Sequence, residues 1–263
     1  MNRSDINDCL VLSEASYLTR YQAQDLADTI GATLHATIHS GSAHCYMFKK
    51  DKTVYFASRG TDIKSLTNII MDAKFMPVWE PGFGFLHKGF LGWADLLWDE
   101  VGAYLVNDGF QAERVVFTGH SAGGAVSNIL ATRASGILKS TGRSKPITVT
   151  FGSPKVGTLG FSIVIGKMTD HYRVTNNNDP VAHVPIWPLF LHAPGQRYHI
   201  LSTGEVVQNP SLMTLIRDVP GGVVHFAWNL LKNIIKMRSV LKAVIAGLRS
   251  HDHFVSNYRM YFK

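Results

Sequence analysis

The sequence predicts an α/β fold in which helices flank both faces of a mostly parallel central sheet. Short apolar, β-branched runs that are typical of buried strands alternate along the chain with longer segments of helical periodicity. The chain has 263 residues, 46% hydrophobic and 17% charged, which is the composition of a globular protein. It shows no internal repeat and no linker composition, so we expect one domain over residues 1–263.

The N-terminal part of the chain is predicted to cover the sheet and to begin it. Apolar residues recur at helical spacing between residues 4 and 30, so we expect a helical cover over residues 1–30. Two strand-like runs, His44–Phe48 and Thr53–Ala57, flank a polar turn and predict a hairpin. Beyond the hairpin we expect a short helix at Leu66–Ala73, an apolar loop at Pro77–Phe85 and a helix from His87 to about Asn107.

The C-terminal part continues the alternation of strands and helices. A polar loop at Lys139–Ser144 precedes a buried strand at Ile147–Phe151, and a further strand follows at His171–Thr175. The last predicted elements are a hairpin formed by Gln196–Ser202 and Glu205–Val207, and a long helix at Val223–Leu248.

The segment Arg114–Leu130 has the pattern of a strand, a sharp turn and a helix, which is the context in which G-x-S-x-G forms a nucleophile elbow. Val115–Phe117 reads as a buried strand, and Gly-His-Ser-Ala-Gly after it matches G-x-S-x-G with Ser121 at its centre. Gly119 and Gly123 lack a Cβ atom, so the chain can turn tightly and hold Ser121 in a strained conformation. The alternative interpretation is a glycine-rich turn that carries a surface serine.

A serine hydroxyl becomes an effective nucleophile only beside a base, and the base needs an acid to fix its tautomer. Asp179 follows a predicted strand in an asparagine-rich turn, whereas the rival acids Asp170 and Asp218 do not follow a strand end. His251 and His253 are the candidate bases nearest the C-terminus, and the residues alone do not separate them. The other downstream histidines are His183, His192, His199 and His225. No third ligand accompanies the His-Asp-His run at a suitable spacing, so we expect no metal site.

Six motifs, in this order along the chain, resemble those of the class 3 lipases, the family of fungal triacylglycerol lipases and their bacterial and plant relatives. The resemblance extends from Val54 to Tyr258 and implies the α/β-hydrolase fold and hydrolysis of carboxylic esters without a cofactor. The motifs are Arg59–Thr61 with Asp72, His87–Phe90, Gly119–Gly124, Thr150–Gly157, Tyr172–Val174 with Asp179, Val181 and Pro185, and Asp252–His253 with Tyr258.

The resemblance also implies a role for individual residues. It makes Ser121 the nucleophile, Asp179 the orienting acid and His253 the base, because the spacing to Tyr258 selects His253 over His251. It implies that the N–H groups of Thr61 and Ala122 form the oxyanion hole, with the Thr61 hydroxyl as a further donor.

Two positions differ from the usual pattern of the family. Asn68 stands where tryptophan is common, in the segment that forms the mobile lid of fungal members. Ala122 replaces a common leucine, which opens space beside the nucleophile and keeps the N–H group.

The predicted helix at about residues 223–248 is amphipathic, with an apolar stripe at helical spacing. Lys232 and Lys236 lie opposite the stripe and Lys242 lies at its border, while Arg238 interrupts it. These charges exclude a membrane span. The helix is either a cover packed on the sheet or a helix that lies at a lipid interface or opens as a lid.

The net charge of +7 favours anionic partners. Because aromatic and basic residues are not interleaved, we expect peripheral contact with an anionic membrane surface and no nucleic-acid partner. The first 20 residues lack the apolar region of a signal peptide, so we expect a cytoplasmic protein, a mature form or export without a cleaved signal; secretion is compatible with this. The only cysteines, Cys9 and Cys45, are too few to hold a fold of this size; reduced thiols are the simpler expectation, and their pairing is left open.

The sequence therefore predicts a serine hydrolase that cleaves lipid esters through an acyl-serine intermediate. Two alternatives remain: a phospholipase A or esterase without triglyceride activity, and an inactive hydrolase fold that binds membranes or a partner protein.

Overall fold

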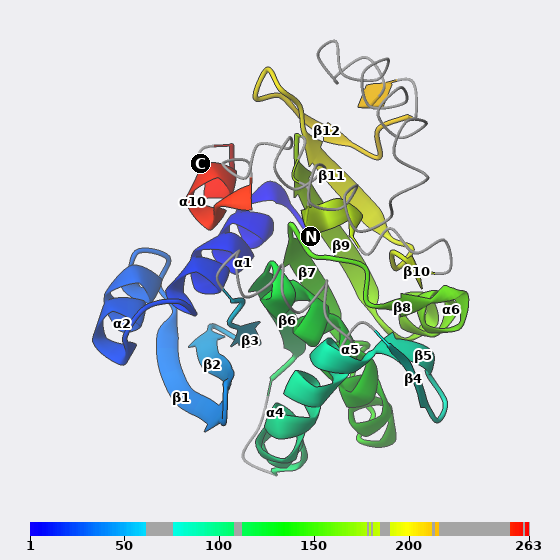
Figure 1. Cartoon of the computed structure of the whole chain (residues 1–263). Helices are drawn as coiled ribbons and strands as arrows, with labels where there is room; N and C mark the ends of the chain where they lie inside the picture. Colours follow the sequence, from blue (N-terminus) through cyan, green and yellow to red (C-terminus); the bar gives the residue numbers. More distant parts are fainter. Residues whose placement is uncertain are drawn as a thin grey trace.

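The computed structural model describes residues 1–61, 76–107, 112–177, 179, 181–184, 190–211, 214–215, 253–259 and 261–262. Its main feature is a sheet whose strands run parallel from β3 through β11 and antiparallel at both edges (Figure 1), which confirms the predicted sheet. The strands are, in spatial order, β1 (Thr33–Ser40), β2 (Ala43–Lys50), β3 (Thr53–Ser58), β6 (Arg114–His120), β7 (Ile147–Phe151), β9 (Asp170–Asn176), β11 (Gln196–Ile200) and β12 (Val206–Gln208).

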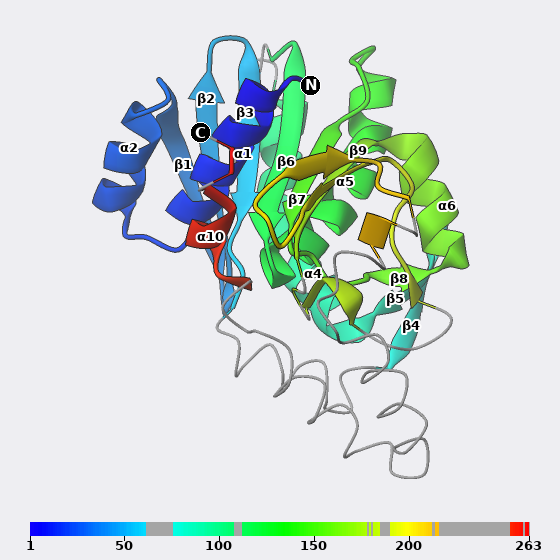
Figure 2. The same cartoon turned by 90° about the horizontal axis from the view of Figure 1, so that it is seen from above.

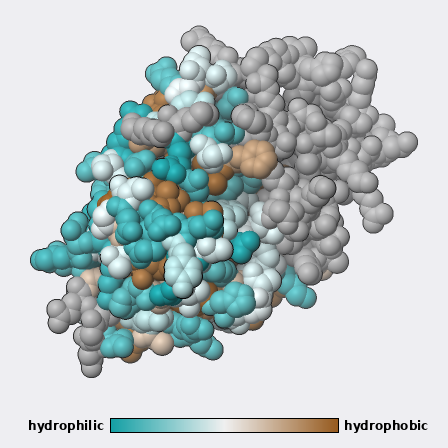
Figure 3. Space-filling model, turned by 90° about the vertical axis from the view of Figure 1, so that its left-hand side faces the viewer, coloured by the Kyte–Doolittle hydropathy of each residue, from teal (hydrophilic) through white to brown (hydrophobic). Residues whose placement is uncertain are grey.

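Helices cover both faces of this sheet (Figures 1 and 2). One face carries α1 (Arg3–Ala15), α2 (Arg20–Asp28) and α10 (Val255–Arg259), and the other carries α4 (Lys88–Val106), α5 (Ala122–Ser140) and α6 (Leu159–Met168). Side chains alternate across the strands between two apolar cores: in β3, Phe56 packs toward α4 and α5, whereas Tyr55 packs toward α1. On the side of β1 and α2, hydrophilic residues make up most of the described surface (Figure 3).

The N-terminal cover consists of two helices. The first begins at a capping box, in which the Asn2 side chain accepts from the Asp5 N–H at 2.8 Å and Asp5 accepts from the Asn2 N–H at 3.0 Å. Cys9 and Cys45 are both buried free thiols.

A second, smaller sheet corrects the prediction of a loop at Pro77–Phe85. Its strands are, in spatial order, β10 (Phe190–Leu191), β8 (Gly157–Thr158), β5 (Gly84–His87) and β4 (Pro77–Glu80). The hairpin of β4 and β5 turns through Gly82, whose φ of 80° suits glycine. The prediction was wrong because proline, glycine and continuous apolar residues hide the alternation that marks a strand. His87 ends β5 and caps α4, which begins one residue later than predicted.

Three further differences concern the lengths and number of elements. The edge strand β1 and helix α6 were not predicted, and α5 continues to Ser140, into the expected polar loop. In β1 only Leu34, Ala36 and Ile38 are buried, so the alternation rests on few large apolar residues.

The predicted helices at 66–73 and 223–248, with Asn68 and Asp72, lie outside the described residues. Within the described part of the chain, none of the helices is long and apolar enough to cross a membrane.

The topology brings the predicted site residues to one edge of the sheet. Parallel strands end on the same side, so the loops after β3, β6, β7 and β9 meet there. These loops carry Thr61, Ser121, Gly152 and Asp179 respectively.

Glycines allow the first turn of α5 to lie directly against β3 and β6. A Cβ atom on Gly123 would lie 2.1 Å from the Ser58 carbonyl oxygen, and one on Gly119 would lie 2.5 Å from the Gly123 carbonyl carbon. Both neighbours are backbone atoms, which cannot rotate away as a side chain does.

Gly123→Ala should therefore lower the free energy of unfolding by about 2 kcal/mol or more, because backbone must shift to admit the methyl group. Gly136→Ala, in the same helix with open space around it, is the matched control and should raise stability by about 0.5–1 kcal/mol. Urea unfolding of the two variants measures both values, and equal effects would contradict the tight packing at Gly123.

Candidate active site

Ser121 occupies the turn between β6 and α5 with a strained backbone. Its φ of 58° and ψ of −132° lie in a region that L-residues rarely adopt. The Ser121 N–H donates to the Phe151 carbonyl oxygen at 2.9 Å, which fixes the turn to the end of β7. The residue is fully buried, and its Oγ has no hydrogen-bond partner among the described residues. The backbone at Ser121 is thus held in place, and the hydroxyl makes no hydrogen bond to another described residue.

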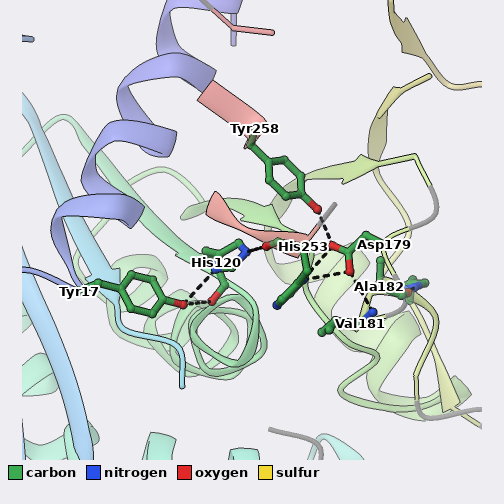
Figure 4. A network of polar contacts seen from close by, with 8 residues as sticks. Tyr17, His120, Asp179, Val181, Ala182, His253 and Tyr258 are labelled. Carbon is green, nitrogen blue, oxygen red and sulfur yellow. Dashed lines mark hydrogen bonds and ion pairs between the residues drawn. The ribbon is translucent and has the colours of Figure 1, made fainter. Parts of the chain in front are cut away.

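Asp179 and His253 form a buried pair at the end of β9 (Figure 4). Both carboxylate oxygens of Asp179 lie 2.9 Å from His253 Nδ1. The Tyr258 hydroxyl donates to Oδ2 at 2.6 Å, and the Val181 N–H donates to Oδ1 at 2.9 Å. The carboxylate therefore has donors on both oxygens, as a buried charge requires.

The contacts of Asp179 determine its charge and the tautomer of His253. Burial alone would raise the pKa of Asp179, but His253 and the Tyr258 hydroxyl outweigh burial and lower this pKa. An ionised carboxylate accepts the Nδ1 proton of His253, so Nε2 of the neutral ring carries the lone pair. Nε2 has no hydrogen-bond partner within the described part of the chain.

Gly152 permits this pair to approach β7. Its φ is 54°, and a Cβ atom there would lie 2.5 Å from Asp179 Oδ2 and 3.2 Å from His253 Nδ1. Gly152 directly follows Phe151, which accepts the Ser121 N–H, so the serine turn and the Asp179–His253 pair meet at the end of the same strand.

His120 and Tyr17 extend the site, and the sequence analysis did not assign either of them a role. Nε2 of His120 lies 2.5 Å from the His253 carbonyl oxygen, and Nδ1 lies 3.0 Å from the Tyr17 hydroxyl (Figure 4). Burial lowers the pKa of His120 to about 3, so its ring is neutral and donates from Nε2 while Nδ1 accepts from Tyr17. His120 could have been identified as a site residue because it occupies the variable position before Ser121 in G-x-S-x-G. The sequence around Tyr17 contains no signal of this kind.

Of the two predicted oxyanion residues, Ala122 directly follows the serine, and Thr61 lies in the loop after β3. Ala122 is the first residue of α5, where N–H groups have no acceptor within the helix. Thr61 is half-buried after β3 and lines a cavity of about 450 Å³. The cavity is also lined by Tyr17, His39, Ser42, Ala43, His44, Arg59, Gly60, Trp93, Leu97 and Val126. Its size suits a small organic ligand.

Three of the rival residues are either exposed or in contact with other groups. Asp170 is exposed at the start of β9, His192 Nε2 lies 2.7 Å from the Ala182 carbonyl oxygen, and His199 Nδ1 lies 2.8 Å from Thr175 Oγ1. Asp218, His225 and His251 lie outside the described residues. The described residues contain no group of three or more His, Cys, Asp or Glu side chains that could hold a metal ion.

This arrangement provides the groups for acyl transfer. Acyl transfer needs a nucleophile, a base and an oxyanion donor, and a strained serine, a histidine with one nitrogen held by a buried carboxylate and a helix N-terminus directly after the serine are groups of these kinds.

Comparisons with known proteins show what the chain is similar to. The family model described as lipase (class 3) matches residues 55–188, about half of the chain. A lipase of Rhizomucor miehei is 33% identical over 183 residues, which are 67% of this chain and 50% of that protein. The secreted mono- and diacylglycerol lipase 3 of Gibberella zeae is 28% identical over 181 residues, 64% of this chain and 53% of that protein. The chain thus spans about half the length of these curated relatives.

Solved structures show the same fold. The triacylglyceride lipase of Rhizomucor miehei superimposes with a TM-score of 0.67 at 27% identity, over 78% of this chain and 82% of that one. A triacylglycerol lipase whose catalytic centre is formed by a serine protease triad gives a TM-score of 0.69 at 27% identity, over 82% of this chain and 89% of that one. The central sheet with its flanking helices is therefore an α/β-hydrolase fold.

Tyr258→Phe should destabilise the protein by about 1–3 kcal/mol at pH 7, because the buried Asp179 carboxylate loses a donor. The folded-state pKa of Asp179 lies below its ordinary value of 3.8, so this stabilisation is present above about pH 4 and is lost as the pH falls through the folded pKa. The difference between variant and wild type should therefore shrink between pH 7 and pH 3 in urea unfolding. A difference that does not change with pH would contradict this charge assignment, and Tyr104→Phe serves as the control.

Proposed function

Since the chain belongs to the class 3 lipase family, we propose that it is a serine hydrolase that cleaves carboxylic ester bonds of lipids. The observation that carries this proposal is the position of His253. Its Nδ1 is held by the buried Asp179 carboxylate, while its Nε2 and the Ser121 hydroxyl both lack partners in the described structure. In the proposed mechanism the Ser121 hydroxyl gives its proton to His253 Nε2, and neither group is occupied by a hydrogen bond to another described residue.

The proposed mechanism uses only groups of the chain and water. Nε2 of His253 takes the Ser121 proton as Oγ attacks the ester carbonyl carbon, and the ionised Asp179 stabilises the imidazolium that forms. The N–H groups of Thr61 and Ala122 stabilise the oxyanion. His253 then protonates the leaving alcohol, and water releases the acid from the acyl-serine by the same steps in reverse.

We propose acylglycerols as the substrate class, and secretion as the location. Relatives named as secreted mono- and diacylglycerol lipases and as triacylglycerol lipases support these proposals. The two apolar cores share one sheet, which supports a single domain over residues 1–263. Hydrolysis rates over a short-to-long p-nitrophenyl ester series, beside phospholipid vesicles, would separate a lipase from a phospholipase A or a short-chain esterase.

Ser121→Ala should reduce ester turnover by roughly 10⁴-fold or more and leave the fold intact, because the attacking oxygen is removed. The wild type should be labelled covalently by a fluorophosphonate, and the variant should not. Substantial activity in the variant would exclude the serine mechanism. Absence of both labelling and turnover in the folded wild type would favour an inactive binding module.

We also propose that the protein contacts anionic membrane surfaces, a proposal supported by its net charge of +7 and by the sequence pattern at residues 223–248. Changing Lys232, Lys236 and Lys242 to glutamine should weaken adsorption to anionic vesicles by roughly 10- to 100-fold, since each basic group contributes about 1 kcal/mol at most. Turnover of a soluble short-chain ester should barely change. Wild-type adsorption by this variant at low salt would contradict the proposed contact.

A further inference from the structure

Two arginines lie beside each other on neighbouring strands of the central sheet. Arg173 in β9 and Arg197 in β11 are partners in the parallel register, so their side chains leave the same face. Like charges in this position repel each other, and both side chains are half-buried. The pair therefore lowers stability unless something compensates it.

The described residues supply no compensating negative charge. Neither guanidinium makes an ion pair or a side-chain hydrogen bond with another described residue, and Arg197 Nε is buried without a partner. Asp170 is exposed and lies on the alternate face of β9, while Asp179 accepts from His253 and Tyr258. Burying a charge without a counter-charge costs free energy, so an anion would be favoured here.

The surrounding side chains add positive charge and neutral donors. Lys155 lies close enough to Arg173 that burial and this guanidinium together lower the Lys155 pKa. Burial and then Arg173 lower the pKa of His171 to about 3, so its ring is neutral. His192 is neutral for the same two reasons. The cluster thus combines three cations with two neutral imidazole rings.

A small cavity adjoins this cluster at Arg173, His171 and His192, and some of the residues that line it have polar atoms without partners. Its volume is about 10 Å³, which is room for one oxygen-sized atom. Four buried atoms of its lining have no partner among the described residues: both ring nitrogens of His171, Thr150 Oγ1 and Asn128 Oδ1. Arg173 and His192 line the same cavity. Buried polar groups are rarely left unpaired, and the donors among these atoms, Thr150 Oγ1 and one ring nitrogen of His171, suit an acceptor oxygen in the cavity.

We propose that this cluster binds a phosphate group, with one oxygen in the cavity and the others on the guanidinium groups of Arg173 and Arg197. Guanidinium groups match the geometry of phosphate oxygens and bind them through paired hydrogen bonds. Lys155 contributes further positive charge, and His171 and Thr150 can donate to the oxygen in the cavity.

Ser153 connects the phosphate site to the residues proposed for catalysis. Ser153 lines the cavity and follows Gly152, which packs against Asp179 and His253. A Cβ atom on Gly124, three residues after Ser121, would lie 2.9 Å from Ser153 Cβ. The bound phosphate is either free inorganic phosphate or the headgroup of a phospholipid substrate. The headgroup is a candidate because of this connection, and it rests on the proposed function.

Thermal unfolding in inorganic phosphate, compared with sodium chloride at equal ionic strength, tests the site without any need for activity. Phosphate at about ten times its dissociation constant should raise the midpoint of wild type by roughly 3 °C over chloride. Arg173→Gln and Arg197→Gln should each lose this increment. Lys167→Gln, an equal change of charge at an exposed position of α6, should keep it.

The stability of the variants in chloride alone shows whether they fold. In chloride alone Arg197→Gln should be at least as stable as wild type, because the repulsion is relieved, and Ser121→Ala should respond to phosphate as wild type does. The proposal is overturned if phosphate and chloride stabilise wild type equally. It is also overturned if the phosphate increment survives in both arginine variants.

The source of the phosphate is distinguished by competition in the active wild type. If the site takes a headgroup, inorganic phosphate should raise the KM for dihexanoyl phosphatidylglycerol several-fold, leave kcat unchanged and leave hydrolysis of a neutral short-chain ester unaffected. If phosphate raises the unfolding midpoint but does not change phospholipid hydrolysis, the site takes free phosphate. Loss of all esterase activity with an intact phosphate increment would count against the proposed function alone.

Discussion

The buried carboxylate of Asp179 is the constraint on which the arrangement of the site depends. A charge without solvent access needs donors, and three come from two parts of the chain: His253 and Tyr258 near the C-terminus, and the Val181 N–H just after the carboxylate. These bonds draw the C-terminal segment onto the end of the sheet. Arg259 then reaches Glu14 of α1 at 2.8 Å, so the N-terminal cover is joined to the same assembly.

Close backbone approach is the second requirement, and glycine satisfies it at three positions near the strand ends. Gly60 lies against the Tyr17 hydroxyl and the His120 carbonyl oxygen, Gly123 lies against β3, and Gly152 lies against Asp179. A methyl group at any of these positions would separate two parts that must touch. The motif glycines therefore serve the contact between loops as much as the turn of the chain.

The two buried charged sites differ in how they are compensated. Asp179 has donors to both of its oxygens and a lowered pKa, so its charge is stabilised by the protein itself. Arg173 and Arg197 face each other across a strand pair with no acid of the described chain beside them. The first arrangement is complete without a ligand, whereas the proposed phosphate would supply the negative charge that the second lacks.

The sequence by itself determined what local pattern encodes. The apolar runs of β6, β7 and β9 and the glycine turn at Ser121 are local signals, because strand periodicity and turn chemistry depend on neighbouring residues. The order of the motifs identified the family, and the resemblance implied Ser121, Asp179 and His253 as site residues. Ser121 and Asp179 lie in loops at the same end of the parallel strands, and His253 contacts Asp179. Their catalytic roles stay proposals.

Tertiary structure alone decided which distant groups touch. The contact of Tyr17 with His120, the hairpin of β4 and β5, and the pairing of Arg173 with Arg197 depend on strand register and on packing across the sheet. Register relates residues that are far apart in the chain, and no local periodicity specifies it. For the same physical reason the sequence displayed Arg173 and Arg197 as two separate basic residues, and only the folded sheet placed them side by side.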